Sequence, residues 1–567
     1  MDNIINDVTD CGNVIYSDEY VDYIIDYRNE DEYGIDSFVV PCTQPIDGSF
    51  EVVYSHIDTF ENVVTRSGFR TVPQCYGLLD AAVIQETGTY RLRRQPFFNL
   101  YGQGVIIGLV DCGIDFTNNA FIRADNTSRI LSVWDQENRS GIPPQDFLYG
   151  TEYTREDIDR ALNGVPVNDD IYGIIDENGH GSSMAAIAAG SEIEENDFSG
   201  MAPLADIAVV KLKKAKPFYM DLYMINREAY AFQENDVMMG IRYLIDISRR
   251  ERKPLVICLG IGTNQGDHNG SGPLCEYLNS IASKTGYYVC AAAGNETGRR
   301  HHFRGMNTSA GDYKDVELLV SERIRGAGMR GFYMELWTDI LSRCSVQIKP
   351  PIGEFSGIID VRERKKRVFD FLLSGSRVEV YSELVEKSTG DQLVIFRVID
   401  PAPGVWTVRV IQESSVPGVF DMWLPMEDFQ QVETVYIEAD PNVIICEPAN
   451  ALNIMTFAAS NADGSRIYVN SSRGYTRDGR IKPDLTAPGE NINVNIGTAT
   501  GTSIAAAVGA GIVALFAEWS IPDQPTNSIA AKKYLISGAR TDNLEVPNRS
   551  WGWGRIDIYN TFVNLFI

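Results

Sequence analysis

The stretch that most constrains this chain covers residues 497–511 and reads GTATGTSIAAAVGAG. The tight Gly501-Thr502 entry is followed by small and apolar residues up to Trp519, a pattern that predicts a helix buried on most sides. Ser503 then lies in the first turn, where backbone N–H groups have no helical partners and carry partial positive charge. These groups can stabilise an oxyanion beside the hydroxyl, although such a serine is more commonly a simple helix N-cap.

A nucleophilic serine needs a base, and the sequence offers only five histidines, namely His56, His180, His268, His301 and His302. His180 lies in NGHGSSMAAIAAG, where it opens a second small-residue helix that we expect over residues 180–189. His301 and His302 follow two arginines and are expected to be solvated. His180 is therefore the candidate base, and a loop histidine bonded to backbone is the simpler alternative.

The third group of a serine triad is a carboxylate that orients the imidazole. Asp111 ends the apolar run of residues 104–110, which predicts a buried strand. A carboxylate at the carboxyl end of a parallel strand lies where open α/β sheets place their sites. Asp115 lies beyond the Gly113 turn and is expected to shape the loop instead.

Together these segments resemble the Asp, His and Ser boxes of the subtilisin-like serine proteases, in that family's order. A fourth segment, residues 291–296 (AAAGNE), resembles the one that supplies the oxyanion-hole asparagine, here Asn295. The resemblance covers most of residues 75–300 and 440–567. It implies an α/β fold with a mostly parallel sheet flanked by helices, and a serine endopeptidase that needs no cofactor. It also implies a substrate-binding set made of a strand that pairs with peptide backbone and a second wall of the primary pocket: Leu259, Gly260, Ile261, Ala292 and Gly294.

The pattern between residues 78 and 297 alternates apolar runs with helical stretches, as expected for an α/β sheet. Strands are predicted at 105–110, 207–212, 255–260 and 287–293, and helices at 180–189, 237–249 and 274–284. The region 312–440 changes to alternating strands separated by Gly and Pro turns, at 316–320, 331–337, 345–348, 378–381, 392–398 and 406–411. This change predicts an inserted β-sandwich of jelly-roll type between catalytic parts 75–311 and 441–567.

Residues 1–74 are acidic and predict a small α+β domain, with strands at 20–27, 37–40 and 49–54 and a helix near 58–65. The resemblance implies a prodomain that assists folding and then occupies the cleft as an inhibitor; a plain accessory domain is the alternative. Autocleavage is expected between Gln74 and Cys75, because residues 72–79 resemble the start of mature subtilisins. A second candidate lies near residues 93–95.

Composition limits the partners and the chemistry. The net charge of −27 disfavours nucleic acid and anionic membranes as partners. Nine scattered cysteines, an odd number with no CxxC pair, predict reduced buried thiols rather than a disulfide framework or a zinc site, and we assign no metal site. The acidic amino terminus lacks the pattern of a secretory signal, and no apolar run approaches the roughly 20 residues of a membrane span.

The prodomain, the missing signal pattern and the insertion narrow the resemblance to the clostridial Csp germination proteases. That resemblance implies cleavage of a spore-cortex lytic enzyme precursor, in the cortex or coat region of a spore, with the cytoplasm as the other location. Some relatives are pseudoproteases that sense germinants, and an active subtilase outside germination is a further alternative. The presence of Asp111, His180, Ser503 and Asn295 favours an active protease.

Overall fold

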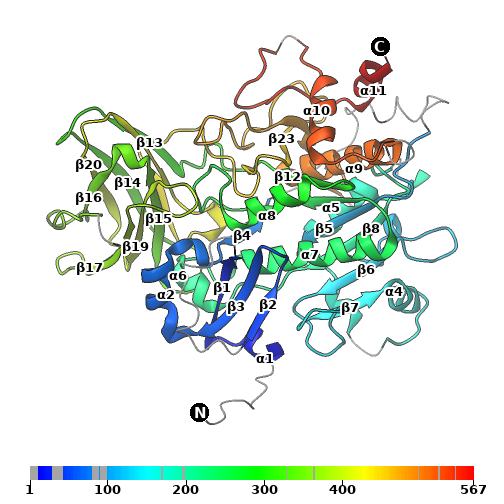
Figure 1. The fold of residues 1–567 in the computed structure, drawn as a ribbon, viewed down its shortest axis with the longest axis horizontal. Coiled ribbons are helices and arrows are strands. Elements are labelled where there is room, and N and C mark those ends of the chain that lie inside the picture. Colours follow the sequence, from blue (N-terminus) through cyan, green and yellow to red (C-terminus); the bar gives the residue numbers. More distant parts are fainter. Residues whose placement is uncertain are drawn as a thin grey trace.

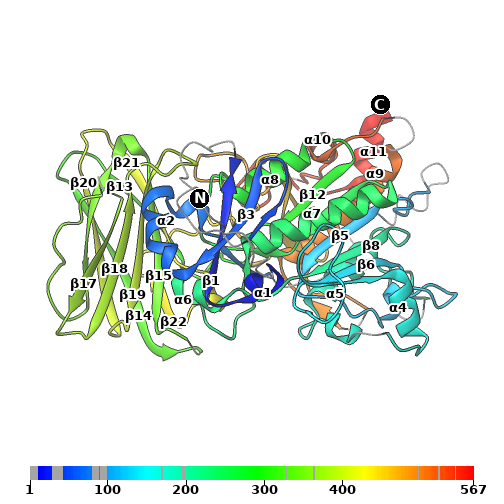
Figure 2. The same cartoon turned by 60° about the horizontal axis from the view of Figure 1, so that its bottom comes forward.

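The fold joins three bodies, which Figures 1 and 2 show as a β-sandwich at one end, an α/β body at the other and a small N-terminal domain against both. The structure is a computed structural model. It describes residues 11–27, 42–79, 89, 99–167, 170–194, 198–326, 328–361, 364–495, 497–520, 524–542 and 544–566.

The α/β body is built on an eight-stranded sheet with the order β24-β23-β12-β10-β5-β8-β6-β7. Its strands are β24 (Leu485–Glu490), β23 (Met455–Asn461), β12 (Tyr287–Ala292), β10 (Leu255–Leu259), β5 (Ile106–Asp111), β8 (Asp206–Lys211), β6 (Ile130–Asp135) and β7 (Thr151–Thr154). The pairs from β24 to β6 are parallel, and the edge strand β7 runs antiparallel to β6. The predicted mostly parallel sheet is therefore confirmed.

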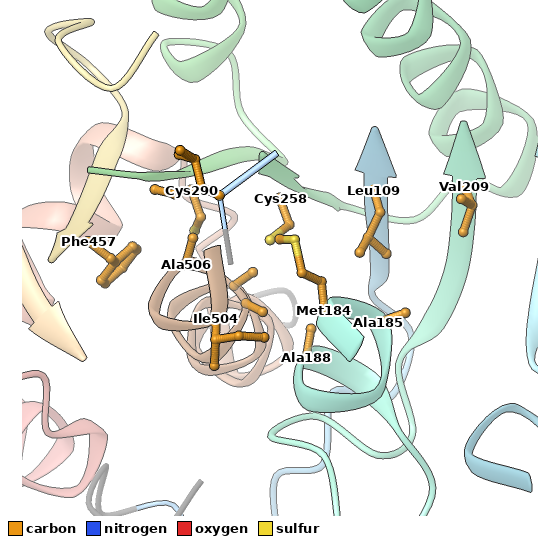
Figure 3. Close-up of a cluster of buried hydrophobic side chains, with 14 of the residues drawn as sticks. Leu109, Met184, Ala185, Ala188, Val209, Cys258, Cys290, Phe457, Ile504 and Ala506 are labelled. Carbon is orange, nitrogen blue, oxygen red and sulfur yellow. The ribbon is translucent and has the colours of Figure 1, made fainter. Parts of the chain in front are cut away.

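Helices cover both faces of this sheet. Because side chains alternate along a strand, Ile107 and Leu109 enter one core while Ile106 and Val110 enter the other. The first core contains α5 (His180–Ala189) and α9 (Thr502–Ser520), which lie side by side beneath the strands in Figure 3. The second contains α7 (Glu234–Glu251) and α8 (Pro273–Ala282). Buried parallel strands of this kind are apolar on both faces, as β5 is.

Small residues let α9 approach its neighbours closely. A Cβ added at Gly511 would lie 2.7 Å from the carbonyl oxygen of Ala188 in α5, and one at Gly509 would lie 2.4 Å from the ring of Phe457 in β23. By length and composition α9 is also apolar enough to cross a membrane, but 89% of its apolar window is buried inside the protein. It is therefore the core helix that the sequence predicts.

The insertion is a sandwich of two antiparallel sheets around its own apolar core, which includes Phe332, Leu336 and Trp406. One sheet consists of β13 (His302–Asn307), β21 (Gly418–Trp423), β15 (Gly331–Thr338), β19 (Gln392–Ile399), β18 (Ser376–Glu383) and β17 (Lys365–Phe371). The other consists of β16 (Cys344–Lys349), β20 (Gly404–Gln412), β14 (Tyr313–Ile324) and β22 (Val432–Tyr436). The predicted β-sandwich is present.

The sandwich begins earlier than expected. Strand β13 pairs with β21 from His302 opposite Trp423 onward, so the insertion starts near residue 302 rather than 312. His301 and His302 are buried, not solvated as predicted from the arginines before them. The His302 ring stacks on Trp423 at 4.9 Å between centroids, and its Nε2 lies 2.9 Å from an Asp421 carboxylate oxygen. Strand pairing with a distant segment thus overrides the local polar pattern.

The N-terminal domain is a three-stranded antiparallel sheet with two helices. Its elements are α1 (Cys11–Tyr16), β1 (Tyr20–Asp26), β2 (Cys42–Pro45), β3 (Phe50–His56) and α2 (Phe60–Ser67), with the strand order β1-β3-β2. They match the strands expected at 20–27 and 49–54 and the helix expected near 58–65, whereas the strand expected at 37–40 lies outside the described residues.

A disulfide joins Cys11 of α1 to Cys42 of β2, which corrects the expectation of reduced cysteines throughout. The other seven cysteines are free and buried, as predicted. No sequence pattern indicates this bond, because its two cysteines are 31 residues apart and are brought together only by the fold of the N-terminal domain.

A buried carboxylate anchors the N-terminal domain to the α/β body. Asp22 of β1 forms an ion pair with Lys216 and accepts hydrogen bonds from the amides of Gln233 at 3.0 Å and Asn235 at 3.1 Å. Its backbone N–H donates to the Tyr219 hydroxyl at 2.7 Å. Burial lowers the pKa of Lys216, an effect that the Asp22 carboxylate opposes. Both charges are shielded from water, so removing either one would leave the other buried without a compensating charge.

The variant Asp22→Ala should loosen this domain, because it leaves the Lys216 ammonium buried without its partner. Such a loss costs about 3–5 kcal/mol, so the undocked population should rise roughly hundredfold or more. The measurement is the rate of trypsin cleavage at Arg66 in α2. Asp18→Ala, at an exposed position in the same domain, is the matched control. Equal cleavage rates in the two variants would contradict the anchoring role.

Candidate active site

The chain leaving the N-terminal domain enters the α/β body as a strand, β4 (Cys75–Leu78). This strand lies between β9 (Phe232–Gln233) and β11 (Ile261–Gly262) and is antiparallel to both. The next residue, Leu79, donates its N–H to the carbonyl oxygen of Gly260 at 3.0 Å. Its own carbonyl oxygen lies 2.7 Å from Nε2 of His180. The strand therefore ends at the candidate base.

Asp111 and His180 are brought together as predicted, by the end of β5 and the first residue of α5. Their Oδ1 and Nδ1 atoms are 2.8 Å apart, and both side chains are buried. Glycine at 181 permits this contact, because a Cβ there would lie 2.1 Å from the carbonyl oxygen of Gly113. The Asp111 carboxylate accepts from Nδ1–H and so holds the ring with Nε2 directed at the Leu79 carbonyl oxygen, which accepts a hydrogen bond when Nε2 also carries a proton.

Hydrogen bonds from neighbouring polar groups hold the histidine and the aspartate in place. The Asn178 side-chain oxygen accepts the His180 N–H at 3.0 Å and the Cys112 thiol at 3.2 Å. The Cys112 N–H donates to Asp111 Oδ1 at 2.8 Å. Ser182, in the first turn of α5, donates its N–H to Asp176 at 2.8 Å. Sequence reasoning singled out neither Asn178 nor Asp176, although Asn178 precedes the histidine box by one residue.

Ser503 is the second residue of α9 and is buried in the first turn, where the sequence placed it. The residue before it, Thr502, holds Asn295: its N–H and its hydroxyl both lie 3.1 Å from the Asn295 side-chain oxygen. The Thr502 hydroxyl in turn accepts the Gly294 N–H at 3.0 Å. Because the amide oxygen of Asn295 is engaged by these donors, its NH₂ group is the end that can face an oxyanion.

Only some of the predicted substrate-binding residues lie beside the strand that ends at Leu79. Gly260 and Ile261 lie on the segment that pairs with β4, whereas Leu259 ends β10 inside the central sheet. A Cβ at Gly262 would lie 3.2 Å from Leu79 Cδ1 and 3.0 Å from Cys446 Cβ.

Ala292 and Gly294, expected to form a second wall of the primary pocket, lie at and just after the end of β12. Ala292 ends β12 and is buried, and a Cβ at Gly294 would lie 2.4 Å from Cys446 Sγ. Cys446, which sequence reasoning did not select, therefore packs between Gly262 and Gly294 beside the Leu79 side chain.

The structure places Leu79, not Gln74, at His180, which corrects the expected position of Gln74 and Cys75. Gln74 lies just before β4, where its N–H and carbonyl group bond to Glu234 at 3.2 and 2.9 Å. The register follows from antiparallel pairing, with Gly77 opposite Gly262. The second candidate, near residues 93–95, lies outside the described residues.

Among the described residues, Asp111, Cys112 and His180 each place a potential metal ligand within 4.8 Å of the others. Two of these ligand atoms, Asp111 Oδ1 and His180 Nδ1, already bond to each other. Burial and the neighbouring carboxylates raise the pKa of the Cys112 thiol, which disfavours the thiolate that a metal would need. The donor set is therefore better suited to proton transfer than to metal binding.

Glu234 generates a pH prediction for this site. It accepts the N–H groups of Gln74 and of Leu274, and burial raises its pKa to about 7. A carboxyl group whose pKa is raised in the folded state makes the protein most stable below the unfolded pKa and destabilises it as the pH rises through about 7.

Glu234→Gln should remove this dependence. Between pH 5 and pH 8 the parent should lose up to about 3 kcal/mol of unfolding free energy relative to the variant. The measurement is urea unfolding at both pH values, and Glu228→Gln, at an exposed site, is the control. A parent and Glu234→Gln variant with the same pH slope would contradict the assignment.

Comparisons with known proteins agree with this geometry. A family model described as the subtilase family matches residues 102–316 and 433–554 and leaves out most of the sandwich. The solved structure of the CspB protease from Clostridium perfringens is similar with a TM-score of 0.71 and 27% identity, over 84% of this chain and 97% of that chain. The subtilisin-like protease SBT2.2 of Arabidopsis thaliana is 28% identical over 171 residues, 26% of this chain. The match spans 19% of that curated relative's length. On the family match and the arrangement of Asp111, His180, Asn295 and Ser503, this chain belongs to the subtilase family of serine peptidases.

Proposed function

We propose that this protein is a serine endopeptidase that cuts its own chain between Leu79 and Asp80 and keeps the N-terminal domain in its cleft. The observation that carries the proposal is the 2.7 Å contact between the Leu79 carbonyl oxygen and His180 Nε2, at the end of an antiparallel strand. Strand addition of this kind binds an extended peptide through its backbone. Residues 75–79 thus have the arrangement of the acyl side of a substrate.

The chemistry follows from the groups in place. His180 takes the Ser503 proton as the hydroxyl oxygen attacks the Leu79 carbonyl carbon, and Asp111 stabilises the resulting imidazolium. Before the attack the Leu79 carbonyl oxygen turns from His180 Nε2 to the Asn295 amide and the Ser503 backbone N–H, which then bind the oxyanion. The imidazolium returns the proton to the Asp80 amine, which leaves, and water then hydrolyses the Leu79 ester to a carboxylate.

The anchor at Asp22 supports retention of the N-terminal domain after cleavage. Asp22 and Arg70 both bind the α/β body from upstream of the proposed cut, and Arg70 pairs with Glu276 at 2.8 Å. The cleaved domain would therefore remain as a product in the cleft, and a substrate in trans must displace it.

The biological substrate we propose is a spore-cortex hydrolase precursor, cut during germination within the spore. The support is the similarity to a clostridial CspB protease, which covers 84% of this chain and 97% of that chain. A second candidate is a pseudoprotease that senses a ligand with its cleft permanently filled. The observation that favours it is the seating of β4 between β9 and β11, which blocks the site.

Intact mass of the recombinant chain tests self-cleavage. The parent should separate into fragments ending at Leu79 and beginning at Asp80, whereas Ser503→Ala should keep a single uncut mass, because no nucleophile remains. Processing in the Ser503→Ala variant would contradict autocatalysis, and an uncut parent would favour the pseudoprotease. A cut after Gln74 would move the site back to the position expected from sequence.

The Thr502 contact predicts a graded effect on the same reaction. Asn295→Ala should slow self-cleavage by about a hundredfold or more, because it removes an oxyanion donor. Thr502→Val should slow it by about tenfold, because the hydroxyl that fixes the Asn295 amide is lost while volume is kept. Thr502→Ser retains the hydroxyl and should restore most of the rate. The rates are measured by mass spectrometry over time. Equal cleavage rates for Thr502→Val and Thr502→Ser would contradict the role of the Thr502 hydroxyl in positioning Asn295.

A further inference from the structure

The sandwich insertion covers one residue of the strand in the cleft. Met426 and Phe429 lie between β21 and β22, at the start and within the short helix η9 (Glu427–Phe429). A Cβ added at Gly77 of β4 would lie 2.7 Å from Met426 Cε and 2.9 Å from Phe429 Cε1. We call these two side chains the roof. The backbone at Gly77 is not left-handed, so space rather than conformation requires glycine there.

The roof is fixed to the α/β body, and both of its side chains are buried. The Phe429 carbonyl accepts the Asn226 N–H at 2.8 Å, and the Gln431 side chain donates to the Ile225 carbonyl at 3.0 Å. Phe429 also donates its N–H to the Met426 carbonyl at 3.0 Å. The flexible tip of Met426 can move aside, whereas the Phe429 ring is buried and its backbone is hydrogen-bonded at both the N–H and the carbonyl group. A side chain at position 77 must therefore displace a packed aromatic edge.

From these contacts we propose that the insertion makes the protease selective for glycine at the third residue before the cut. The proposal rests on the proposed function, because Gly77 is third only if Leu79 is the residue whose carbonyl is attacked. Gly77 lies directly opposite Gly262 of β11, so the peptide backbone at this position is held against the body on one side. The substrate class is a protein with an extended segment that carries glycine third and leucine first before the scissile bond.

Selectivity of this kind arises from steric exclusion rather than attraction. A roof that touches the peptide backbone adds apolar contact for glycine and a clash for larger residues, and overpacking of this kind is costly. The sandwich would thus take part in substrate choice although it carries none of the triad residues.

The test is the rate of self-cleavage in the full chain, followed by intact mass after cell-free synthesis. Gly77→Ala should slow the cut by about tenfold and Gly77→Val by about a hundredfold. When Phe429→Ala is also present, the ratio of the cleavage rate with glycine at position 77 to the rate with valine there should fall below about tenfold. Met426→Ala should likewise reduce the ratio of the rates with glycine and with alanine at position 77 to below about tenfold. Gly48→Val is the control, because nothing lies within 4 Å of a Cβ at that exposed glycine of the N-terminal domain.

The outcomes separate this inference from the proposed function. If the parent cuts after Leu79 and Gly77→Val cuts equally fast, glycine selectivity is wrong and the protease assignment stands. If the position 77 variants are slow but neither roof variant relieves them, the roof is not the cause and the inference is overturned. If the parent itself is never cut after Leu79, the proposed function fails and the selectivity fails with it.

Discussion

The close approach of α5 and α9 beneath one sheet is the constraint on which the rest of the structure depends. His180 opens one helix and Ser503 lies in the first turn of the other, so their separation is set by how nearly the two backbones can meet. Gly511 faces the Ala188 carbonyl at a distance that no side chain would permit. Asp111 completes the arrangement from the end of β5, which packs against α5. The long run of small residues is thus a geometric requirement of the site.

The sequence predicted the parts that are specified locally. The bounds of α5 agree with the expected 180–189, because its small apolar residues and glycine-flanked start have few other uses. Leu79 could not be found in this way. The strand before it reads Cys-Tyr-Gly-Leu, too short and too glycine-centred to predict a strand, and it is extended only because β9 and β11 flank it. The resemblance to mature subtilisin starts therefore indicates Gln74, which lies five residues before the residue that contacts His180.

The other differences have the same origin in distant pairing. The arginines before His302 predict a solvated loop residue, yet His302 begins a strand whose partner, β21, lies more than a hundred residues later. The Cys11–Cys42 bond depends on α1 folding back on β2. The roof residues Met426 and Phe429 belong to no sequence motif. The role proposed for them rests only on their contact with Gly77. Residues whose role is to touch another element cannot be recognised before that element is placed.

The buried pair of Asp22 and Lys216 affects how fast the N-terminal domain can separate from the α/β body. Both charges lose their hydration when the N-terminal domain docks, and on departure each must leave its partner before water can replace it. The barrier to separation is then higher than the equilibrium strength of the contact alone requires, since a well-formed desolvated charge pair chiefly slows dissociation. For the cut chain that we propose, the important quantity is therefore the residence time of the N-terminal domain: slow departure would outlast brief changes in the surroundings and would answer only to a signal that lasts or that acts on the pair itself.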